Sequence, residues 1–310
     1  MSKLKTFIKL WNSDRKKVYS AFIHNVSKTS FSHLISDKLF LKMQYKATFG
    51  KKLDLKNPKT YNEKLQWLKL YNRKTIYTEM VDKYEAKKYV SELIGEEYII
   101  PTLGVWDNFD DIDFDKLPDK FVIKCTHDSG SVVICRDKNT FDLDKAKTKI
   151  NKSLKRSLFW HGREWPYKNL KPRIIAEQYL EDEFSKELSD YKFYCFNGEP
   201  RILYVSRGLE NHETARISFV TLDWEQAPVK RGDFKSFEQL PPKPKTFDLM
   251  MELAKKLSEN IPFLRVDFYD INGQLYFGEL TFFPGAGFTV LEPEEWDYTL
   301  GNWIRLPEKK

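Results

Sequence analysis

The sequence is poor in the residues that build disulfide frameworks and common metal sites. Its 310 residues include three cysteines and five histidines. Cys125, Cys135 and Cys195 are an odd number without a CxxC spacing, which argues against disulfide pairing and thiolate zinc sites. We expect them to be small apolar strand residues, because free cysteine is commonly buried. The histidines form no HExxH or HxH pair, which excludes the common histidine zinc motifs.

Long hydrophobic runs are also absent. The longest uncharged stretch, residues 280–291, contains a proline and two glycines, whereas a spanning helix needs about 18 apolar residues. Residues 1–17 have no uninterrupted apolar region of the kind that a secretory signal requires. The sequence therefore predicts a cytoplasmic location. A hydrophobic content of 41% is sufficient for a buried core, and the length predicts two domains or one large domain.

The net charge of +7 is concentrated at the N-terminus. Residues 1–57 hold thirteen Lys and Arg and three Asp, a net +10, so the other residues sum to −3. Leu4, Phe7, Ile8 and Trp11 recur at helical spacing among lysines. We expect a basic helical arm that either lies on the inner membrane surface, attracted by anionic lipid, or packs on the body. No nucleic-acid-binding signature accompanies the charge, so nucleic acid is not an expected partner.

The order of elements predicts an α+β fold with much antiparallel sheet. Residues 61–94 have the periodicity of a helix that ends at Gly95, and residues 107–119 are an acidic, turn-rich boundary. The expected strands are residues 120–125, 132–135, 173–180, 191–196, 201–205, 263–269 and 274–283. Asn197-Gly198 between two of them predicts a hairpin.

A second hairpin carries two acids. In strands that flank Asn272-Gly273, Arg265 and Asp267 share one face, and Glu279 and Thr281 share another. The two polar faces coincide when the residue numbers of paired positions add up to an even number, as they do for 267 and 279. A two-residue turn alone gives an odd sum, so the pattern predicts a three- or five-residue loop or a bulge.

Neighbouring carboxylates repel each other unless a cation joins them. Hard oxygen ligands suit Mg²⁺, which uses one or two carboxylates together with substrate phosphates. The alternative is a solvated acidic strand face with Arg265 as a surface counter-ion. The following Pro284-Gly285-Ala286-Gly287 allows a close backbone approach, which a plain exposed strand does not need and which favours a site.

Residues 121–135 predict a strand, a small polar loop and a second strand. Ser129, Gly130 and Ser131 offer backbone N–H groups and hydroxyls suited to phosphate, and Lys124 at the strand end would reach it. An ordinary hairpin has the same pattern. Residues 174–183 run from a hydrophobic strand into acids, an arrangement that would suit a purine edge and ribose hydroxyls.

The succession of these motifs resembles the ATP-grasp superfamily and, more narrowly, the TupA-like ATP-grasp proteins found with bacterial polysaccharide synthesis. The narrower resemblance covers about residues 57–306. Its longest runs are NPKTYNEKLQWLKLYNR, VDKYEAKKYV, DYKFYCFNGEP and RVDFYDINGQLYFGELTFFPGAGF.

The resemblance implies two small α+β subdomains that clamp ATP. The first would span residues 119–180 and the second, with the magnesium-binding strands, residues 181–310. A helical region at 58–118 and the basic helical arm at 1–57 would precede them.

The resemblance also implies site residues. Those that would contact ATP are Lys124, Ser129, Gly130, Ser131, Glu177, Gln178, Leu180, Asp182, Glu183 and Lys192. The implied ligands of Mg²⁺ are Asp267, Glu279 and Thr281. Arg265 and Lys192 would act on the reacting groups. Thr281 departs from the family, which commonly has Asn there, and a hydroxyl is the weaker ligand.

Residues 160–171 combine aromatic and basic side chains. Aromatic faces bind sugar C–H surfaces and Arg binds carboxylates, so His161, Arg163 and Trp165 are candidate contacts to an acidic saccharide. A lid over the nucleotide is the alternative for this segment.

The activity that the resemblance implies is an ATP- and Mg²⁺-dependent carboxylate–amine ligase acting through an acyl phosphate. Its setting would be surface or capsule polysaccharide, with an amino acid joined to an acidic sugar. One alternative is a metal-dependent glycosyltransferase using Asp111, Asp113 and Asp115, although these acids lie in a turn-rich stretch. Another is a basic, non-enzymatic scaffold on the membrane.

Overall fold

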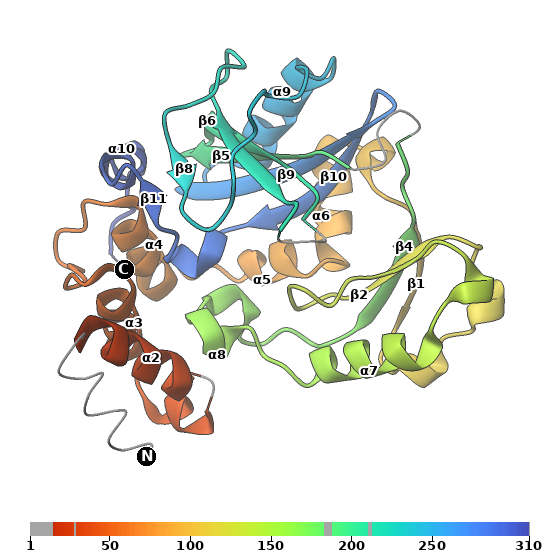
Figure 1. Ribbon diagram of the computed structural model, residues 1–310, viewed down its shortest axis with the longest axis horizontal. Coiled ribbons are helices and arrows are strands. Elements are labelled where there is room, and N and C mark those ends of the chain that lie inside the picture. The colour runs from red at the N-terminus through yellow and green to blue at the C-terminus, as the bar shows by residue number, and fades with distance from the viewer. Residues whose placement is uncertain (1–14, 28, 183–187, 210–212, 310) are drawn as a thin grey trace.

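Two antiparallel sheets and the helices around them make up the computed structural model (Figure 1), which describes residues 15–27, 29–182, 188–209 and 213–309. The smaller sheet has the order β1-β4-β2-β3. Its strands are β1 (Thr102–Trp106), β2 (Phe121–Cys125), β3 (Val133–Cys135) and β4 (Ile174–Gln178). Helix α7 (Leu143–Leu154) packs on β2, and Ala146 and Ile150 complete a small core there.

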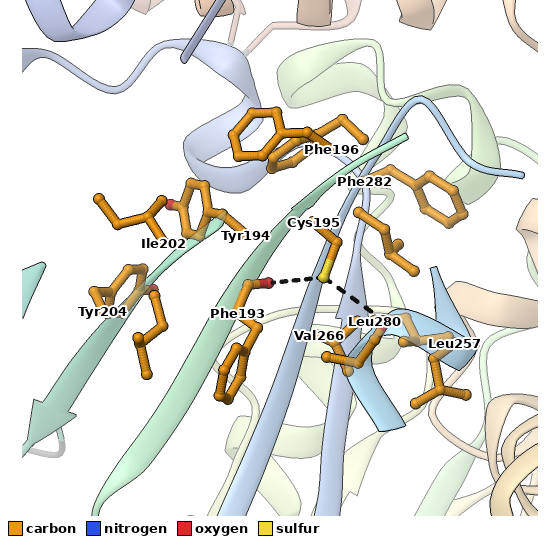
Figure 2. Packing of buried hydrophobic residues seen from close by; sticks show 14 of the residues in the cluster. Phe193, Tyr194, Cys195, Phe196, Ile202, Tyr204, Leu257, Val266, Leu280 and Phe282 are labelled. Carbon is orange, nitrogen blue, oxygen red and sulfur yellow. Dashed lines mark hydrogen bonds between the residues drawn. The ribbon is translucent and has the colours of Figure 1, made fainter. Parts of the chain in front are cut away.

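The larger sheet has the order β10-β9-β5-β6-β7. Its strands are β5 (Asp190–Phe196), β6 (Glu199–Arg207), β7 (Arg216–Val220), β9 (Phe263–Ile271) and β10 (Gln274–Thr281). Helix α9 (Phe247–Leu257) lies along β5 and β6. Figure 2 shows Cys195 in the core of this layer, where its thiol lies 3.8 Å from the carbonyl oxygen of Ala254 in α9. A short pair, β8 (Lys230–Arg231) and β11 (Leu291–Glu292), completes the strands.

Residues 58–118 are less uniformly helical than predicted. The expected helix at 61–94 is three helices, α4 (Tyr61–Tyr71), α5 (Ile76–Val81) and α6 (Glu85–Ile94). The break before α6 has a local cause, because the Asp82 carboxylate accepts the backbone N–H groups of Tyr84 and Glu85 at 2.9 and 3.0 Å. Strand β1 also lies in this range, so the smaller sheet extends across the boundary expected at residue 119.

Three expectations from the sequence are confirmed. Asn197 and Gly198 both have positive φ and connect β5 to β6 with Phe196 opposite Glu199, a two-residue hairpin turn. All three cysteines are free and buried in strands. In the described ranges no helix is long and apolar enough to cross a bilayer.

The arm is helical where the structure describes it. It contains α2 (Arg15–Ser27), the 3₁₀ helix η1 (Ser30–Leu34) and α3 (Asp37–Phe49). The pattern predicted for Leu4 to Trp11 lies outside the described residues. Figure 1 shows α2 and α3 at the edge of the molecule, away from the smaller sheet and beside α4.

The remaining short helices connect these layers. They are η2 (Glu96–Tyr98), η3 (Phe109–Asp111), η4 (Phe114–Lys116), η5 (Lys138–Thr140), α8 (Phe159–Gly162), η6 (Trp165–Tyr167), η7 (Pro284–Gly287) and α10 (Glu295–Trp303).

Candidate active site

A pocket lies where the two sheets meet α5 and α6. Its enclosed space is small, about 20 Å³, and the rest is open to solvent. Apolar side chains from α5, from the segment before β1 and from β10 form much of its wall. The residues that line it are Met80, Val81, Lys83, Ala86, Lys87, Ile99, Ile100, Lys124, Glu177, Phe277, Gly278, Glu279 and Leu280.

Glu177 is the centre of a charged group on the side of the smaller sheet. Because β2 and β4 pair with Val122 opposite Glu177, Lys124 lies diagonally beside Glu177 on the same face. The Glu177 carboxylate forms ion pairs with Lys124 and, at 2.7 Å, with Lys87. Burial alone would raise the pKa of Glu177, but the two ammonium groups outweigh burial and hold it below its ordinary value.

Lys87 and Lys83 were missed in the sequence. The Lys87 ammonium also donates to the carbonyl of Ile100 at 2.6 Å, and burial lowers its pKa. Lys83 donates to the carbonyl of Asp128 and lies 3.7 Å from the Glu279 carboxylate, so it connects the loop after β2 to β10. Lys87 is three residues before the buried Val90, so both lie on the same side of α6. This spacing could have identified Lys87 in the sequence as a lysine that faces the interior.

The β9–β10 hairpin contains the predicted bulge. Ile271 pairs with Gln274 around the two-residue turn Asn272-Gly273, and the register shifts between Phe277 and Glu279. Beyond this shift, at Gly278, Glu279 pairs with Asp267 and Thr281 with Arg265. The bulge therefore restores the even register and places the polar residues of both strands on one face.

Asp267 is buried between two cations. Arg265 donates to both of its oxygens at 2.6 Å, and Lys192, its partner on β5, donates to one of them at 2.9 Å. Lys192 is also 3.2 Å from Asp190. Burial opposes the charged form of Asp267, but Arg265 and Lys192 outweigh it and lower its pKa. The pKa of Lys192 is raised for the converse reason, by Asp190 and Asp267 against burial.

The donor set at this face fits Mg²⁺. A carboxylate has about four lone-pair positions, and Asp267 uses three of them for Arg265 and Lys192. Glu279 is partly exposed to the pocket and its contacts are long, at 3.4 Å to Arg265, 3.4 Å to Thr281 and 3.7 Å to Lys83. Both acids therefore retain oxygen positions for a hard cation. The Thr281 hydroxyl is directed at Glu279.

The loop after β2 is anchored at both ends. Ser131 donates to Asp128 at 2.5 Å and accepts the backbone N–H of Cys125 at 2.8 Å, and Thr126 donates to Asp82 at 2.9 Å. Ser129 and Gly130 at its tip are exposed, and Gly130 has a φ of 93°. Only the tip is therefore open to a ligand, because Ser131 is buried and holds the loop in shape.

The connector after β4 lies beyond the pocket lining. Gln178 is exposed and its backbone N–H donates to the carbonyl of Pro101 at 3.0 Å. Leu180 and Asp182 are half-buried. Glu183 lies outside the described residues. Of the described residues 178–182, none lines the pocket.

Arg163 does not have the predicted position. It is 0% exposed and donates to the carbonyl of Ser32 at 2.6 Å, while Asp37 lies 3.4 Å away and the Phe40 ring centroid 4.2 Å away. The prediction that Arg163 contacts a substrate is corrected, because its guanidinium anchors the arm instead. His161 is exposed and Trp165 is half-buried, so both remain candidates.

Lys69 ties the same segment to the end of β10. Its buried ammonium donates to Gln66 at 2.9 Å and to the carbonyls of Gly162 and Ala286, each at 2.6 Å. The positive φ of Gly285, Ala286 and Gly287 permits this close approach. Burial lowers the pKa of Lys69 to about 7, against the opposing effect of Glu164.

The acids considered for a glycosyltransferase lie in the exposed 3₁₀ turns before β2. Asp113 accepts the backbone N–H of Asp115 at 3.2 Å and pairs with Lys116 at 3.0 Å. Asp111 accepts from Asn108 at 2.9 Å. Across the part of the chain that the structure describes, no group of three or more His, Cys, Asp or Glu is placed to hold a metal ion.

Several solved ligases resemble the chain weakly in structure. D-alanine–D-alanine ligase from Bacillus anthracis, complexed with ATP, is 18% identical with a TM-score of 0.38, over 65% of this chain and 54% of that chain. The Helicobacter pylori enzyme is 15% identical with a TM-score of 0.38, over 79% and 69%. The ATP-grasp ligase PsnB, complexed with a precursor variant, Mg and ADP, is 9% identical with a TM-score of 0.39, over 79% and 61%. The chain thus spans little more than half the length of the B. anthracis ligase.

Family membership rests on sequence. No curated protein matches the chain. The family model described as TupA-like ATPgrasp matches residues 63–305, which include the pocket, the loop after β2 and the carboxylate hairpin. The chain therefore belongs to the TupA-like ATP-grasp family.

Proposed function

We propose that this protein is an ATP- and Mg²⁺-dependent ligase that joins a carboxylate to an amine. One observation supports this most directly. A single pocket brings Lys87 and Lys124, beside the smaller sheet, together with Glu279 of the larger sheet. Phosphoryl transfer from ATP requires cationic side chains that bind the phosphates and carboxylates that bind a metal ion.

In this proposal the pocket holds the nucleotide. Its apolar wall would cover adenine, and Lys124 and Lys87 would meet the phosphates when Glu177 releases them. The exposed tip Ser129-Gly130 would close over the phosphates through its backbone N–H groups. The connector with Gln178, Leu180, Asp182 and Glu183 would contact the adenine edge and ribose after a closing movement of the two sheets.

The chemistry proceeds in two steps. An oxygen of the substrate carboxylate attacks the γ-phosphorus of ATP, the bond to the bridging oxygen breaks, and an acyl phosphate and ADP result. The amine then attacks the carbonyl carbon, inorganic phosphate leaves, the amine loses a proton, and an amide forms. Arg265 and Lys192, fixed by Asp267, would stabilise the negative charge that develops on oxygen. Mg²⁺ held by Asp267 and Glu279, assisted by Thr281, would supply neutralisation of phosphate charge.

For the substrates, we propose an amino acid and an acidic sugar of a surface polysaccharide. The setting comes from the family resemblance, and His161 and Trp165 are the candidate contacts. Arg163 has no part in this proposal, because it is buried against the arm.

The test combines binding and trapping. Purified protein with Mg²⁺ should be stabilised against heat by ATP, and hydroxylamine should trap the acyl phosphate as a hydroxamate across a panel of uronic and amino acids. Asp267→Asn and Glu279→Gln should each abolish hydroxamate formation, and the exposed Asp113→Asn should leave it unchanged. Protection by UDP-sugars but not by ATP, with loss of activity in Asp113→Asn, would instead support the glycosyltransferase.

A further inference from the structure

The corner between η1 and α3 exposes large apolar side chains. Phe31 is 64% exposed, Leu34 82% and Leu39 53%. Residues three apart in a 3₁₀ helix lie on the same edge, so Phe31 and Leu34 of η1 project together. Leu39 follows in the first turn of α3, and we call these three residues with Lys38 and Lys42 the apolar–basic corner.

The exposure of Leu39 does not reflect a poorly packed helix. Phe40, Leu41 and Tyr45 bury the inner face of α3. On the outer face, Leu39, Lys42 and Lys46 are spaced i, i+3 and i+7 and therefore share one side. The inner face of α3 is thus buried against the protein, and its separate outer face exposes a leucine together with lysines.

The charge of this outer face has one sign. Within the described part of the chain, Lys38 and Lys42 are exposed and have no ion-pair partner. The one acid of α3, Asp37, is directed inward, at 3.1 Å from Arg73 and 3.4 Å from Arg163. The sequence before the described residues adds Lys3, Lys5 and Lys9 against the single acid Asp14.

The corner is fixed to the body of the protein. The buried Arg163 donates to the carbonyl of Ser32 inside η1, and His33 stacks on Trp160 with ring centroids 3.8 Å apart. Gln44 of α3 donates to the carbonyl of His161 at 3.2 Å. These contacts present the apolar–basic corner on a rigid support, so its side chains do not have to be ordered again on binding.

We propose that the apolar–basic corner docks on a bilayer with anionic headgroups. Phe31, Leu34 and Leu39 enter the interface, and Lys38 and Lys42 contact the headgroups. A bilayer fits better than a protein partner, because projecting apolar tips beside a charge of one sign match a surface that is apolar inside and anionic outside. This inference is independent of the proposed ligase activity.

The experiment measures vesicle co-sedimentation of the full chain. The probes are vesicles of pure phosphatidylcholine and vesicles of phosphatidylcholine with phosphatidylglycerol in equal parts. Binding to the second kind should exceed binding to the first by more than tenfold and should weaken with added salt. Lys38→Glu with Lys42→Glu should lower the partition coefficient by more than tenfold, since each lysine contributes about fivefold. Phe31→Ser with Leu34→Ser should lower it by about tenfold or more.

The control is Leu143→Ser, which removes a 45% exposed apolar side chain on α7 and should leave partitioning unchanged. Circular dichroism verifies that each variant is folded. Equal binding of all variants, or no binding to the anionic vesicles, would overturn the proposal. A dimer in light scattering that Leu34→Ser converts to a monomer would also overturn it, because the corner would then be a contact between two copies of the chain.

Discussion

Asp267 and Glu279 are cross-strand partners because Gly278 is bulged out of β10. With Gly278 paired instead of bulged, the turn at Asn272-Gly273 would set Glu279 toward the apolar face and Leu280 toward the face of Arg265 and Asp267. The bulge at Gly278 therefore lets the two carboxylates share a face, although β10 has one residue more than regular pairing needs.

Deleting Gly278 should leave Glu279 opposite Asp267, because the residue that follows Phe277 would then pair with Asp267 in a regular ladder. ATP binding should therefore persist and stability should change little, because Glu279 stays on the face of Asp267 and Leu280 stays on the apolar face. Urea denaturation and an ATP titration measure the two effects.

Gly278→Ala is the matched control, because it keeps the residue count. Its Cβ would meet the Tyr269 ring at 3.0 Å and the carbonyl of Asp267 at 3.1 Å, so it should cost about 1–2 kcal/mol but retain ATP binding. Loss of ATP binding by the deletion variant, with its stability unchanged, would contradict the role given to the pairing of Glu279 with Asp267.

Lys87 should contribute to nucleotide affinity although it lies on a helix rather than in the sheets. It shares Glu177 with Lys124 inside the pocket. Lys87→Met should raise the Kd for ATP about 10–100-fold, since hydrogen bonds to charged groups contribute about 1.5–3 kcal/mol. Isothermal titration with ATP and Mg²⁺ measures this change.

The neighbouring Lys88 provides the comparison. Its side chain is 79% exposed and lies 4.0 Å from Glu92, so Lys88→Met should bind ATP as the unmodified chain does. Similar affinities for both variants would remove Lys87 from the proposed site.

The sequence predicted those parts of the site that depend on local rules. Strand alternation and the turn at Asn272-Gly273 together required the bulge that the structure contains. Lys124 and Glu177 were chosen from the order of motifs, and both line the pocket.

Other parts depend on contacts between distant segments. Lys83 and Lys87 precede β4 by about ninety positions, and only the packing of α6 between the sheets brings Lys87 to Glu177. Arg163 lies among aromatic and basic residues typical of a substrate-binding loop. Its guanidinium instead contacts Ser32 and Asp37, which precede it by more than a hundred positions. Side-chain type alone does not distinguish an anion-binding arginine from one buried by a neighbouring helix.

Acid should destabilise the protein through Asp267 and Glu177. Their folded pKa values lie below the ordinary ones, so their contribution is complete above about pH 4 and is lost as the pH falls through the folded values. Asp297 acts oppositely, since burial raises its pKa to about 6 and its contribution falls as pH rises from about 4 to 6. Comparing the free energy of unfolding of the unmodified chain with that of Asp267→Asn isolates the contribution of Asp267.

Asp267→Asn should lower the free energy of unfolding by about 3–5 kcal/mol at neutral pH, because it leaves Arg265 and Lys192 without a buried counter-charge. The difference in unfolding free energy from the unmodified chain should narrow as the pH falls below about 4, where Asp267 is protonated first in the unfolded chain and, at lower pH, in the folded protein. Urea denaturation over this range measures it, with the exposed Asp248→Asn as the control. A difference that stays constant with pH would contradict the charge argument.

Arg163 should hold the arm on the body. Its guanidinium joins the carbonyl of Ser32, the carboxylate of Asp37 and the face of Phe40. Helix α3 adds a small apolar cluster, the ion pair of Asp37 with Arg73 and the hydrogen bond from Gln44 to His161. Arg163→Met should leave the buried Ser32 carbonyl without this donor, at a cost of about 1–3 kcal/mol. The loss should appear as faster amide hydrogen exchange in residues 29–49, with β5 and β9 unchanged, because opening of the arm does not require the sheets to unfold.

Arg156→Met, at an exposed position before α8, should alter neither segment. Uniformly faster exchange in Arg163→Met would mean that the arm and the sheets unfold as one unit.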